Sequence, residues 1–246
     1  MRCIPFPLFS RLAFLLGAVL VSLAPTLASA EQMKAVIPVP QTETWWTDRH
    51  ERAVTRVREG QVDLLFIGDS ITQGWEEDGR LVWDTYYGNR RAVNLGFNSD
   101  QTENVLWRLQ HGELDGIAPK LTIVMIGTNN TAMREDPPEN TAAGVKAILT
   151  TLRTRLPQTQ ILLLAVFPRG VSDDDPLRRV NRAVNERLRA FADRRHVFFL
   201  DLSQRFLDDH GRLSEDVMPD RLHPSERGYR LWAEGMEDLV KQLLDE

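Results

Sequence analysis

Phe66-Ile67-Gly68-Asp69-Ser70-Ile71-Thr72 joins a short apolar run to a turn of small residues. Such a turn at the end of a buried strand predicts that a helix begins there, with Ser70 at its start. A hydroxyl in that place is exposed and lies near the positive N-terminal end of the helix. Serine also caps helices in many turns of this kind. The stretch therefore leaves two interpretations of Ser70 open, a nucleophile and a helix cap.

Apolar runs like the one before Ser70 recur along the chain and alternate with helical patterns. Each run is short enough for a buried strand, and five are expected, at residues 64–67, 92–95, 121–126, 161–166 and 197–200. Helices are expected at residues 45–58, 102–111, 141–156, 176–194 and 226–244, with Pro157 and Gly170 as breakers. Alternation of this kind predicts a parallel sheet, because parallel neighbours require long right-handed crossovers. The expected fold class is α/β, a three-layer α/β/α sandwich around a five-stranded parallel sheet that binds ligands at the carboxyl ends of its strands.

Two further segments place polar side chains near expected strand and helix ends. Gly127-Thr128-Asn129-Asn130 follows the third strand, where an asparagine N–H could stabilise an oxyanion, although Asn129 and Asn130 could equally be turn formers. Asp220-Arg221-Leu222-His223-Pro224 precedes the last helix. A carboxylate three residues before a histidine can fix the imidazole tautomer and leave the other ring nitrogen facing a serine. Together these segments predict a serine hydrolase.

Other chemistries fit the sequence less well. The nucleophile motif G-x-S-x-G fails because the glycine after Ser70 is Gly74, two positions too late. A phosphate-binding loop fails because no Gly-Lys-Ser/Thr ending follows. No cluster of His, Cys and carboxylate residues stands at ligand spacing, so neither a metal nor an organic cofactor is expected.

The order Ser70, Asn129, Asp220, His223 and the blocks around these residues resemble the SGNH (GDSL-like) hydrolase superfamily. The likeness extends to the catalytic subunits of the intracellular platelet-activating factor acetylhydrolases, and it covers most of residues 45–243. The segments that carry it are 105–109, 112–114, 119–120, 127–130, 168–170, 176–178 and 184–185. The resemblance implies a flavodoxin-like SGNH fold, Ser70 as nucleophile, Asp220 and His223 as its catalytic partners, and Asn129 as the oxyanion-hole side chain.

The second amide of the expected oxyanion hole is where this sequence departs from that family. The family's oxyanion glycine directly precedes an aspartate, whereas here Ser99 precedes Asp100 and Gly96 lies three residues earlier. A serine amide can still donate, but a positive φ would cost energy at a residue with a side chain. We expect the amides of Ser70 and Ser99 and the side chain of Asn129 to form the hole, with Gly96 as the alternative to Ser99.

Residues 1–30 have the pattern of a secretory signal peptide. Arg2 and Arg11 flank a short start, an apolar run covers residues 12–23, and Ala28-Ser29-Ala30 forms a small-x-small cleavage site. The run is shorter than the roughly 20 residues that a membrane anchor needs. We therefore predict cleavage after Ala30, a secreted or periplasmic location, and no membrane span after cleavage.

The rest of the chain is expected to comprise an N-terminal leader at residues 31–44 and one hydrolase domain at residues 45–246. A content of 42% hydrophobic and 26% charged residues is typical of soluble globular proteins. The single cysteine, Cys3, lies in the predicted signal peptide, which excludes disulfides, zinc–cysteine sites and cysteine nucleophiles from the mature chain. With 30 basic and 35 acidic side chains there is no basic stripe for a phosphate backbone, so nucleic acid is not an expected partner.

Short acyl specificity is what the acetylhydrolase resemblance implies, and export favours acetylated carbohydrates or other small esters as substrates. The alternatives are a lysophospholipase or other lipid acylhydrolase, and a non-catalytic binding module on the same fold. Trp75, Trp83 and Trp107 could form a platform for a sugar ring, although tryptophan in such positions is more often part of the core. The resemblance also suggests a homodimer.

Overall fold

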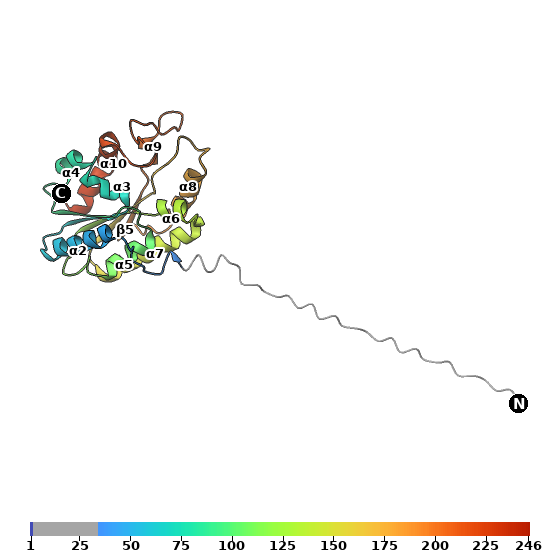
Figure 1. Ribbon diagram of the computed structural model, residues 1–246, viewed down its shortest axis with the longest axis horizontal. Coiled ribbons are helices and arrows are strands. Elements are labelled where there is room, and N and C mark those ends of the chain that lie inside the picture. The colour runs from blue at the N-terminus through green and yellow to red at the C-terminus, as the bar shows by residue number, and fades with distance from the viewer. Residues whose placement is uncertain (2–33) are drawn as a thin grey trace.

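The computed structural model describes residue 1 and residues 34–246, and it shows a central sheet between two layers of helices (Figure 1). All paired strands run parallel, in the order β2-β1-β3-β4-β5. The strands are β1 (Leu64–Gly68), β2 (Ala92–Gly96), β3 (Leu121–Met125), β4 (Gln160–Leu164) and β5 (Val197–Leu200). The predicted α/β sandwich with a five-stranded parallel sheet is confirmed. Apart from Met1, the predicted signal peptide lies outside the described residues and stays a prediction.

Helices cover both faces of this sheet (Figure 1). One layer comprises α3 (Ser70–Gln73), the 3₁₀ helix η1 (Gly74–Glu76), α4 (Arg80–Tyr86), α9 (Ser203–Phe206) and α10 (Glu226–Leu244). The other comprises α2 (Thr44–Arg58), α5 (Thr102–Gln110), α7 (Pro138–Arg155) and α8 (Pro176–Arg189), with the short α6 (Thr128–Met133) against α7 and α8. The chain thus supplies both layers that the alternating pattern predicted.

Two hydrophobic cores lie on opposite faces of the sheet because side chains alternate along each strand. In β1, Leu64 and Phe66 belong to the core beneath α10, whereas Leu65 and Ile67 belong to the core beneath α5 and α7. Every residue of β1 is buried, as expected of a central strand in a parallel sheet. The sheet therefore holds the end of β1, where Ser70 follows, between two packed layers.

Trp75, Trp83 and Trp107 are packed against other side chains, which agrees with their interpretation as core residues rather than as a sugar platform. Trp75 is fully buried, and its ring lies 4.8 Å from that of Trp232 between centroids. Trp83 is half-buried against Phe66, with ring centroids 4.9 Å apart, and Trp107 stacks on His111 at 3.9 Å. None of the three rings lies among the residues that surround Ser70 and His223.

Several helix boundaries differ from the sequence-based expectation. Helix α7 begins at Pro138 rather than at residue 141, because proline is well tolerated at a first helical position, where no backbone N–H is needed. Helix α8 ends at Arg189 rather than at residue 194, since the Asp193 carboxylate accepts the amides of residues 195–197 and closes a turn there. The short helices α4, α6 and α9 were not predicted.

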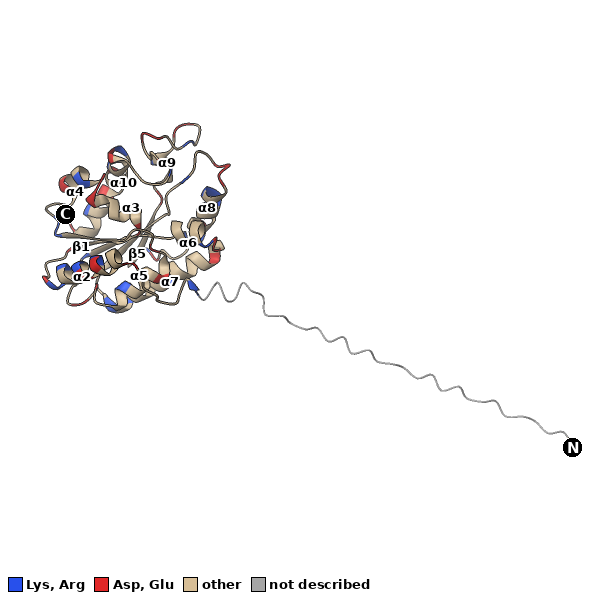
Figure 2. Ribbon diagram, in the orientation of Figure 1, with Lys and Arg blue, Asp and Glu red and all other residues tan. Residues whose placement is uncertain are grey.

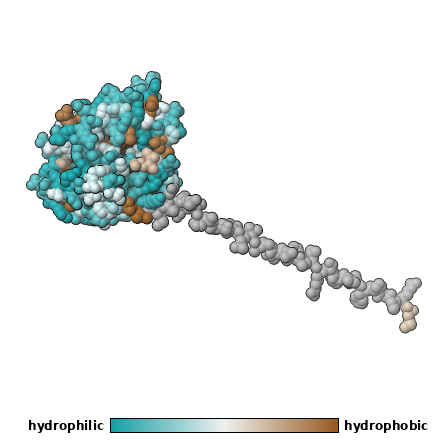
Figure 3. All heavy atoms as spheres, viewed as in Figure 1, coloured by the Kyte–Doolittle hydropathy of each residue, from teal (hydrophilic) through white to brown (hydrophobic). Residues whose placement is uncertain are grey.

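The outer surface is polar and mixed in charge. Figure 2 shows acidic and basic residues interspersed along the helices, and the face in Figure 3 is mostly hydrophilic with small separate hydrophobic patches. Among the residues that the structure describes, no helix has both the length and the apolar character needed to cross a bilayer.

Candidate active site

Ser70 is the first residue of α3, and it does not cap that helix. The N-cap is Asp69, whose Oδ1 accepts the Ile71 amide at 3.0 Å. The helix-cap interpretation of Ser70 is therefore wrong. Gly68 makes the turn before it possible, because a Cβ at that position would collide with the Thr72 side chain and the Met125 carbonyl. The result is a hydroxyl presented at the carboxyl end of β1.

A chain of hydrogen bonds joins Ser70 to the loop before α10. Ser70 Oγ lies 2.9 Å from His223 Nε2, and His223 Nδ1 lies 2.6 Å from Asp220 Oδ2. The other oxygen of Asp220 accepts the amides of Leu222 and His223, at 3.0 and 2.7 Å. One carboxylate thus holds the imidazole by its ring nitrogen and by its backbone. The structure places Ser70, His223 and Asp220 in the order in which a serine nucleophile, its base and the orienting carboxylate contact one another.

The ionised form of Asp220 is favoured in this loop. Partial burial raises the pKa of its carboxyl, but hydrogen bonds from the His223 side chain and from the two loop amides outweigh burial and hold the pKa below its ordinary value. An ionised Asp220 keeps the proton of the neutral imidazole on Nδ1 and leaves Nε2 free to accept from Ser70.

Ser99 and Gly96, the two alternatives for the second oxyanion amide, have different surroundings. The Gly96 amide donates to Asn94 Oδ1 at 2.8 Å, and a Cβ on Gly96 would collide with the backbone of residues 72–73. Its lack of a side chain therefore serves the close approach of α3 to β2. Ser99 has a φ of 61°, in the left-handed region, and its amide donates to no other group within the described residues.

Asn129 and Asn130 both lie in the first turn of α6, so the turn-former interpretation is wrong. Asn129 Nδ2 donates one N–H to the Asp100 carbonyl oxygen at 3.0 Å, which leaves its second N–H available. Asn130 is fully buried, and its amide group bonds with Thr102, Glu103 and Asp136. Asn129 can therefore still donate to a bound oxyanion, whereas Asn130 serves the structure.

The carboxyl of Asp69 is buried beside Ser70, and no sequence pattern predicted its raised pKa. Burial is the largest influence and raises its pKa to about 7, against the hydrogen bond from Ile71 and the nearby His223, which lower it. Its Oδ2 has no hydrogen-bond partner among the described residues. Asp69 thus carries a proton through much of the range below neutral pH.

The buried side chain of Arg178 in α8 supports the loop that carries His223. Arg178 donates to the carbonyl oxygens of Arg169, Gly170 and Gly211, at 2.7, 2.6 and 2.8 Å. The Gly170 amide in turn donates to the Arg221 carbonyl oxygen at 2.9 Å, inside the loop that carries the histidine. This role of Arg178 was not predicted, because its partners are main-chain carbonyl groups, which every residue has and which leave no pattern in the sequence.

Two hollows share Asn98 as a lining residue, and one of them contains Ser70. One, of about 360 Å³, is lined by Ser70 and His223 and by the acidic pair Glu77 and Asp78. The other, of about 650 Å³, is lined by Ser99 and by residues of the segment before and at the start of α2, including Trp45. Asn98 borders both hollows. The hollow at Ser70 and the hollow at Ser99 are therefore neighbours.

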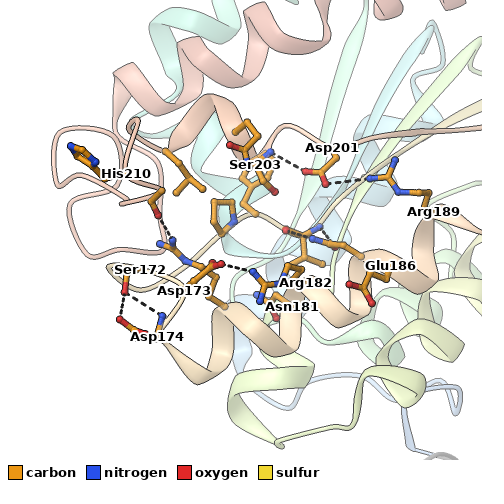
Figure 4. A pocket seen from close by; sticks show the side chains of 18 residues that line it. Ser172, Asp173, Asp174, Asn181, Arg182, Glu186, Arg189, Asp201, Ser203 and His210 are labelled. Atoms are coloured by element: carbon orange, nitrogen blue, oxygen red, sulfur yellow. Dashed lines mark hydrogen bonds and ion pairs between the residues drawn. The ribbon is translucent and has the colours of Figure 1, made fainter.

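A third cavity, of about 520 Å³, lies between α8 and the segment that follows β5 (Figure 4). None of Ser70, Asp220 and His223 lines it. Its charged side chains largely pair with one another, as Figure 4 shows for Arg182 with Asp173 and for Arg189 with Asp201. Within residues 34–246, no three His, Cys, Asp or Glu side chains converge as a metal site would require.

Comparison with known proteins gives results that agree with this geometry. Residues 66–231 match the model of the GDSL-like lipase/acylhydrolase family. The chain is 35% identical over 207 residues to the alpha2 subunit of platelet-activating factor acetylhydrolase IB of Rattus norvegicus, which covers 84% of this chain and 88% of that protein.

Two solved structures share the fold. A GDSL-like lipase from Bacteroides thetaiotaomicron has a TM-score of 0.64 at 17% identity, covering 78% of this chain and 97% of that one. A catalytic mutant of an acetylxylan esterase from Geobacillus stearothermophilus has a TM-score of 0.58 at 19% identity, covering 75% and 94%.

Proposed function

This chain belongs to the GDSL-like lipase/acylhydrolase family and is an ester-hydrolysing serine hydrolase, and from that premise we propose that it is an exported acetylesterase. Its substrates are acetylated carbohydrates or other small esters, and its catalytic residues are Ser70, His223 and Asp220. The observation that carries the proposal is the hydrogen-bonded chain from Ser70 Oγ through the imidazole to the Asp220 carboxylate, at 2.9 and 2.6 Å.

The reaction begins when His223 Nε2 accepts the Ser70 proton as Ser70 Oγ attacks the ester carbonyl carbon. The oxyanion that forms receives the amides of Ser70 and Ser99 and the free N–H of Asn129. Collapse of this intermediate expels the alcohol, which takes the proton from His223 and leaves Ser70 acylated. Water, deprotonated by the same histidine, then hydrolyses the acyl-enzyme and releases the acid.

Ser99 is preferred to Gly96 as the second amide for two reasons. The Ser99 amide is without a partner in the described part of the chain, whereas the Gly96 amide is already bonded to Asn94. The left-handed backbone at Ser99 is also a strained conformation of the sort that accumulates at functional sites.

The hollow beside Ser99 favours a polar alcohol such as a sugar. Trp45 is 40% exposed there, and the side chains of Gln41, Gln101 and Asn104 line the same hollow. An exposed indole face with amide groups around it can stack on a sugar ring and hydrogen-bond its hydroxyls. An acetylxylan esterase among the structural neighbours and an acetylhydrolase among the relatives add support for acetyl specificity.

Export is proposed from residues 1–30 alone, whose pattern is that of a cleavable signal peptide. N-terminal sequencing of the protein recovered from the periplasm or medium of a bacterial host is expected to begin at Glu31. A homodimer, suggested by the resemblance to the acetylhydrolase subunits, stays a prediction.

The proposed function is tested with p-nitrophenyl esters from acetate to palmitate, hydrolysed by the mature protein and by Ser70→Ala. Acetate should be cleaved fastest, and the variant should retain less than about one-thousandth of the activity. Acetylated xylose and glucose are the substrates to measure next.

Other outcomes would support other functions. A preference for long chains would support a lipid acylhydrolase. If the wild-type protein and Ser70→Ala were equally inert on every ester, the non-catalytic binding module would replace the esterase.

A further inference from the structure

The carboxylate of Asp100 is fully buried directly after Ser99, and each of its oxygens has a partner. Oδ1 accepts hydrogen bonds from Trp46 Nε1 and Gln41 Nε2, both at 2.7 Å. Oδ2 accepts from Arg108 Nε at 2.8 Å. A buried carboxylate is costly unless it is paired and hydrogen-bonded, and here three donors from three places in the chain meet that requirement.

Arg108 carries the other end of this pair and is itself fully buried. It lies over the Phe97 ring, 3.8 Å from the centroid, and also pairs with Glu113. Its remaining N–H groups donate to the carbonyl oxygens of Leu95 at 3.2 Å and Gly68 at 3.4 Å. The Arg108 side chain therefore holds the end of β2, shortly before Ser99, and the end of β1, shortly before Ser70.

Asp100 also contacts Asn129, the third donor of the proposed oxyanion hole. The Asp100 carbonyl oxygen accepts the bond from Asn129 Nδ2, and the Asp100 amide donates to the Phe97 carbonyl oxygen at 3.2 Å. Ser70, Ser99 and Asn129 come from separate segments, yet each lies next to an atom that Asp100 or Arg108 holds. No other ion pair in the described chain touches all three segments.

The segment before α2 packs against Asp100 and contributes the side chain of Gln41 to the unit formed by Asp100 and Arg108. Besides the Asp100 carboxylate, Gln41 Nε2 donates to the Asn98 carbonyl oxygen at 3.0 Å. The same segment is fastened to α5, because Ala35 and Val39 accept hydrogen bonds on their carbonyl oxygens from Thr102 Oγ1 at 2.9 Å and Asn104 Nδ2 at 3.0 Å.

We propose that Asp100 and Arg108 are positioning residues for the oxyanion hole, and that Gln41 completes the unit from the segment that precedes the hydrolase domain. The inference rests on the proposed function, since it assigns the unit a role in stabilising the oxyanion. Asp100 and Arg108 are fully buried and do not reach the substrate, and Gln41 acts on the hole through its hydrogen bonds to Asp100 and Asn98. They act by holding the Ser99 amide and the Asn129 side chain where the negative charge develops.

The test uses Gln41→Ala in the full mature protein, because loss of buried Arg108 could unfold it. Gln41 is half-buried and belongs to neither core. With p-nitrophenyl acetate we expect kcat to fall about tenfold while KM stays within about twofold, since misplaced donors weaken the transition state more than the substrate complex. The inhibition constant of phenylboronic acid, whose tetrahedral adduct on Ser70 places an oxygen in the hole, should weaken by a similar factor.

A second variant and a control complete the experiment. Trp46→Phe keeps an aromatic ring at this position but removes the indole N–H, the other donor to Asp100 Oδ1. It should show the same selective loss in kcat. Gln158→Ala, at an exposed glutamine in the turn before β4, should match the wild type.

Unchanged kcat and boronate inhibition in Gln41→Ala and Trp46→Phe would overturn the positioning role, as would a change in KM alone. Failure of the proposed function would look different, because the wild-type protein itself would then lack Ser70-dependent hydrolysis.

Discussion

Ser99 combines a strained backbone with an unpaired amide at the edge of the site. Its φ of 61° is a left-handed conformation that costs a residue with a Cβ roughly 1 kcal/mol or more. The sequence shows that serine stands where the family has glycine, so the strain could be foreseen. Its neighbour Asp100 could not be interpreted in this way, because the partners Gln41 and Trp46 lie 59 and 54 positions away in the chain.

Ser99→Gly is expected to keep full activity, because the proposed donor is the main-chain amide. Relief of the left-handed strain should exceed the entropy cost of glycine and raise the free energy of unfolding by up to about 1 kcal/mol. Urea denaturation and kcat on p-nitrophenyl acetate measure both effects.

Gly96→Ala is the contrasting variant, because it adds a side chain at the other candidate for the second oxyanion amide. A Cβ there meets the backbone of residues 72–73, so we expect a loss of about 1–3 kcal/mol in stability and a displaced Ser70 with lowered kcat. Unchanged stability and kcat in Gly96→Ala would contradict the close packing of α3 against β2 at Gly96.

Asp69 gives the stability of the protein a pH dependence of defined sign. Burial raises its pKa from 3.8 to about 7, so the folded protein holds this proton more tightly than the unfolded chain does. The stabilising contribution is complete below about pH 4 and is lost as the pH rises through about 7, at about 1.4 kcal/mol for each unit of pKa shift.

Asp69→Asn removes this titration while keeping an oxygen for the Ile71 amide. Relative to the wild type, the variant should gain stability between pH 5 and pH 8, as measured by thermal unfolding at both values. An equal difference in melting temperature at the two pH values would show that Asp69 is ionised throughout.

The elements of this fold differ in how strongly the sequence marks them. Strands such as β1 and β3 are uninterrupted apolar runs, and α10 has both a serine cap and a clear apolar periodicity, so their positions were predicted within one or two residues. Helices α4, α6 and α9 have four to seven residues, too few for a period of 3.6 to repeat clearly. Their positions depend on tertiary contacts that the local sequence does not contain.

Arg178→Lys tests how α8 supports the catalytic loop. Lysine cannot span the three carbonyl groups that the guanidinium reaches, so we expect a loss of about 2 kcal/mol in the free energy of unfolding. Because the Gly170 amide holds the loop of His223 through Arg221, kcat should fall as well.

The matched control is Arg179→Lys, one position along the same helix. Arg179 is exposed and donates only to the carbonyl oxygens of Asp173 and Asp174. Its replacement should leave stability and kcat unchanged, and equal effects of the two substitutions would contradict the special role of Arg178.

At the scale of the whole molecule, the parallel sheet explains why the candidate site was largely predictable while its surroundings were not. Parallel strands place their carboxyl ends at one edge, so Ser70 after β1, Ser99 after β2 and Asn129 after β3 had to come close. The hollows beside them are formed by side chains from distant segments, such as Trp45 in α2 with Met133 in α6. No local pattern in the sequence predicts such contacts, so the exposed position of Trp45 could not be foreseen.

The bond between Ser70 and His223 spans 153 residues and closes just before the final helix. A chain that ends anywhere before residue 223 lacks the histidine that contacts Ser70. Recovery of esterase activity during refolding should lag behind the return of helical circular dichroism, because local helices form before a contact that spans 153 residues.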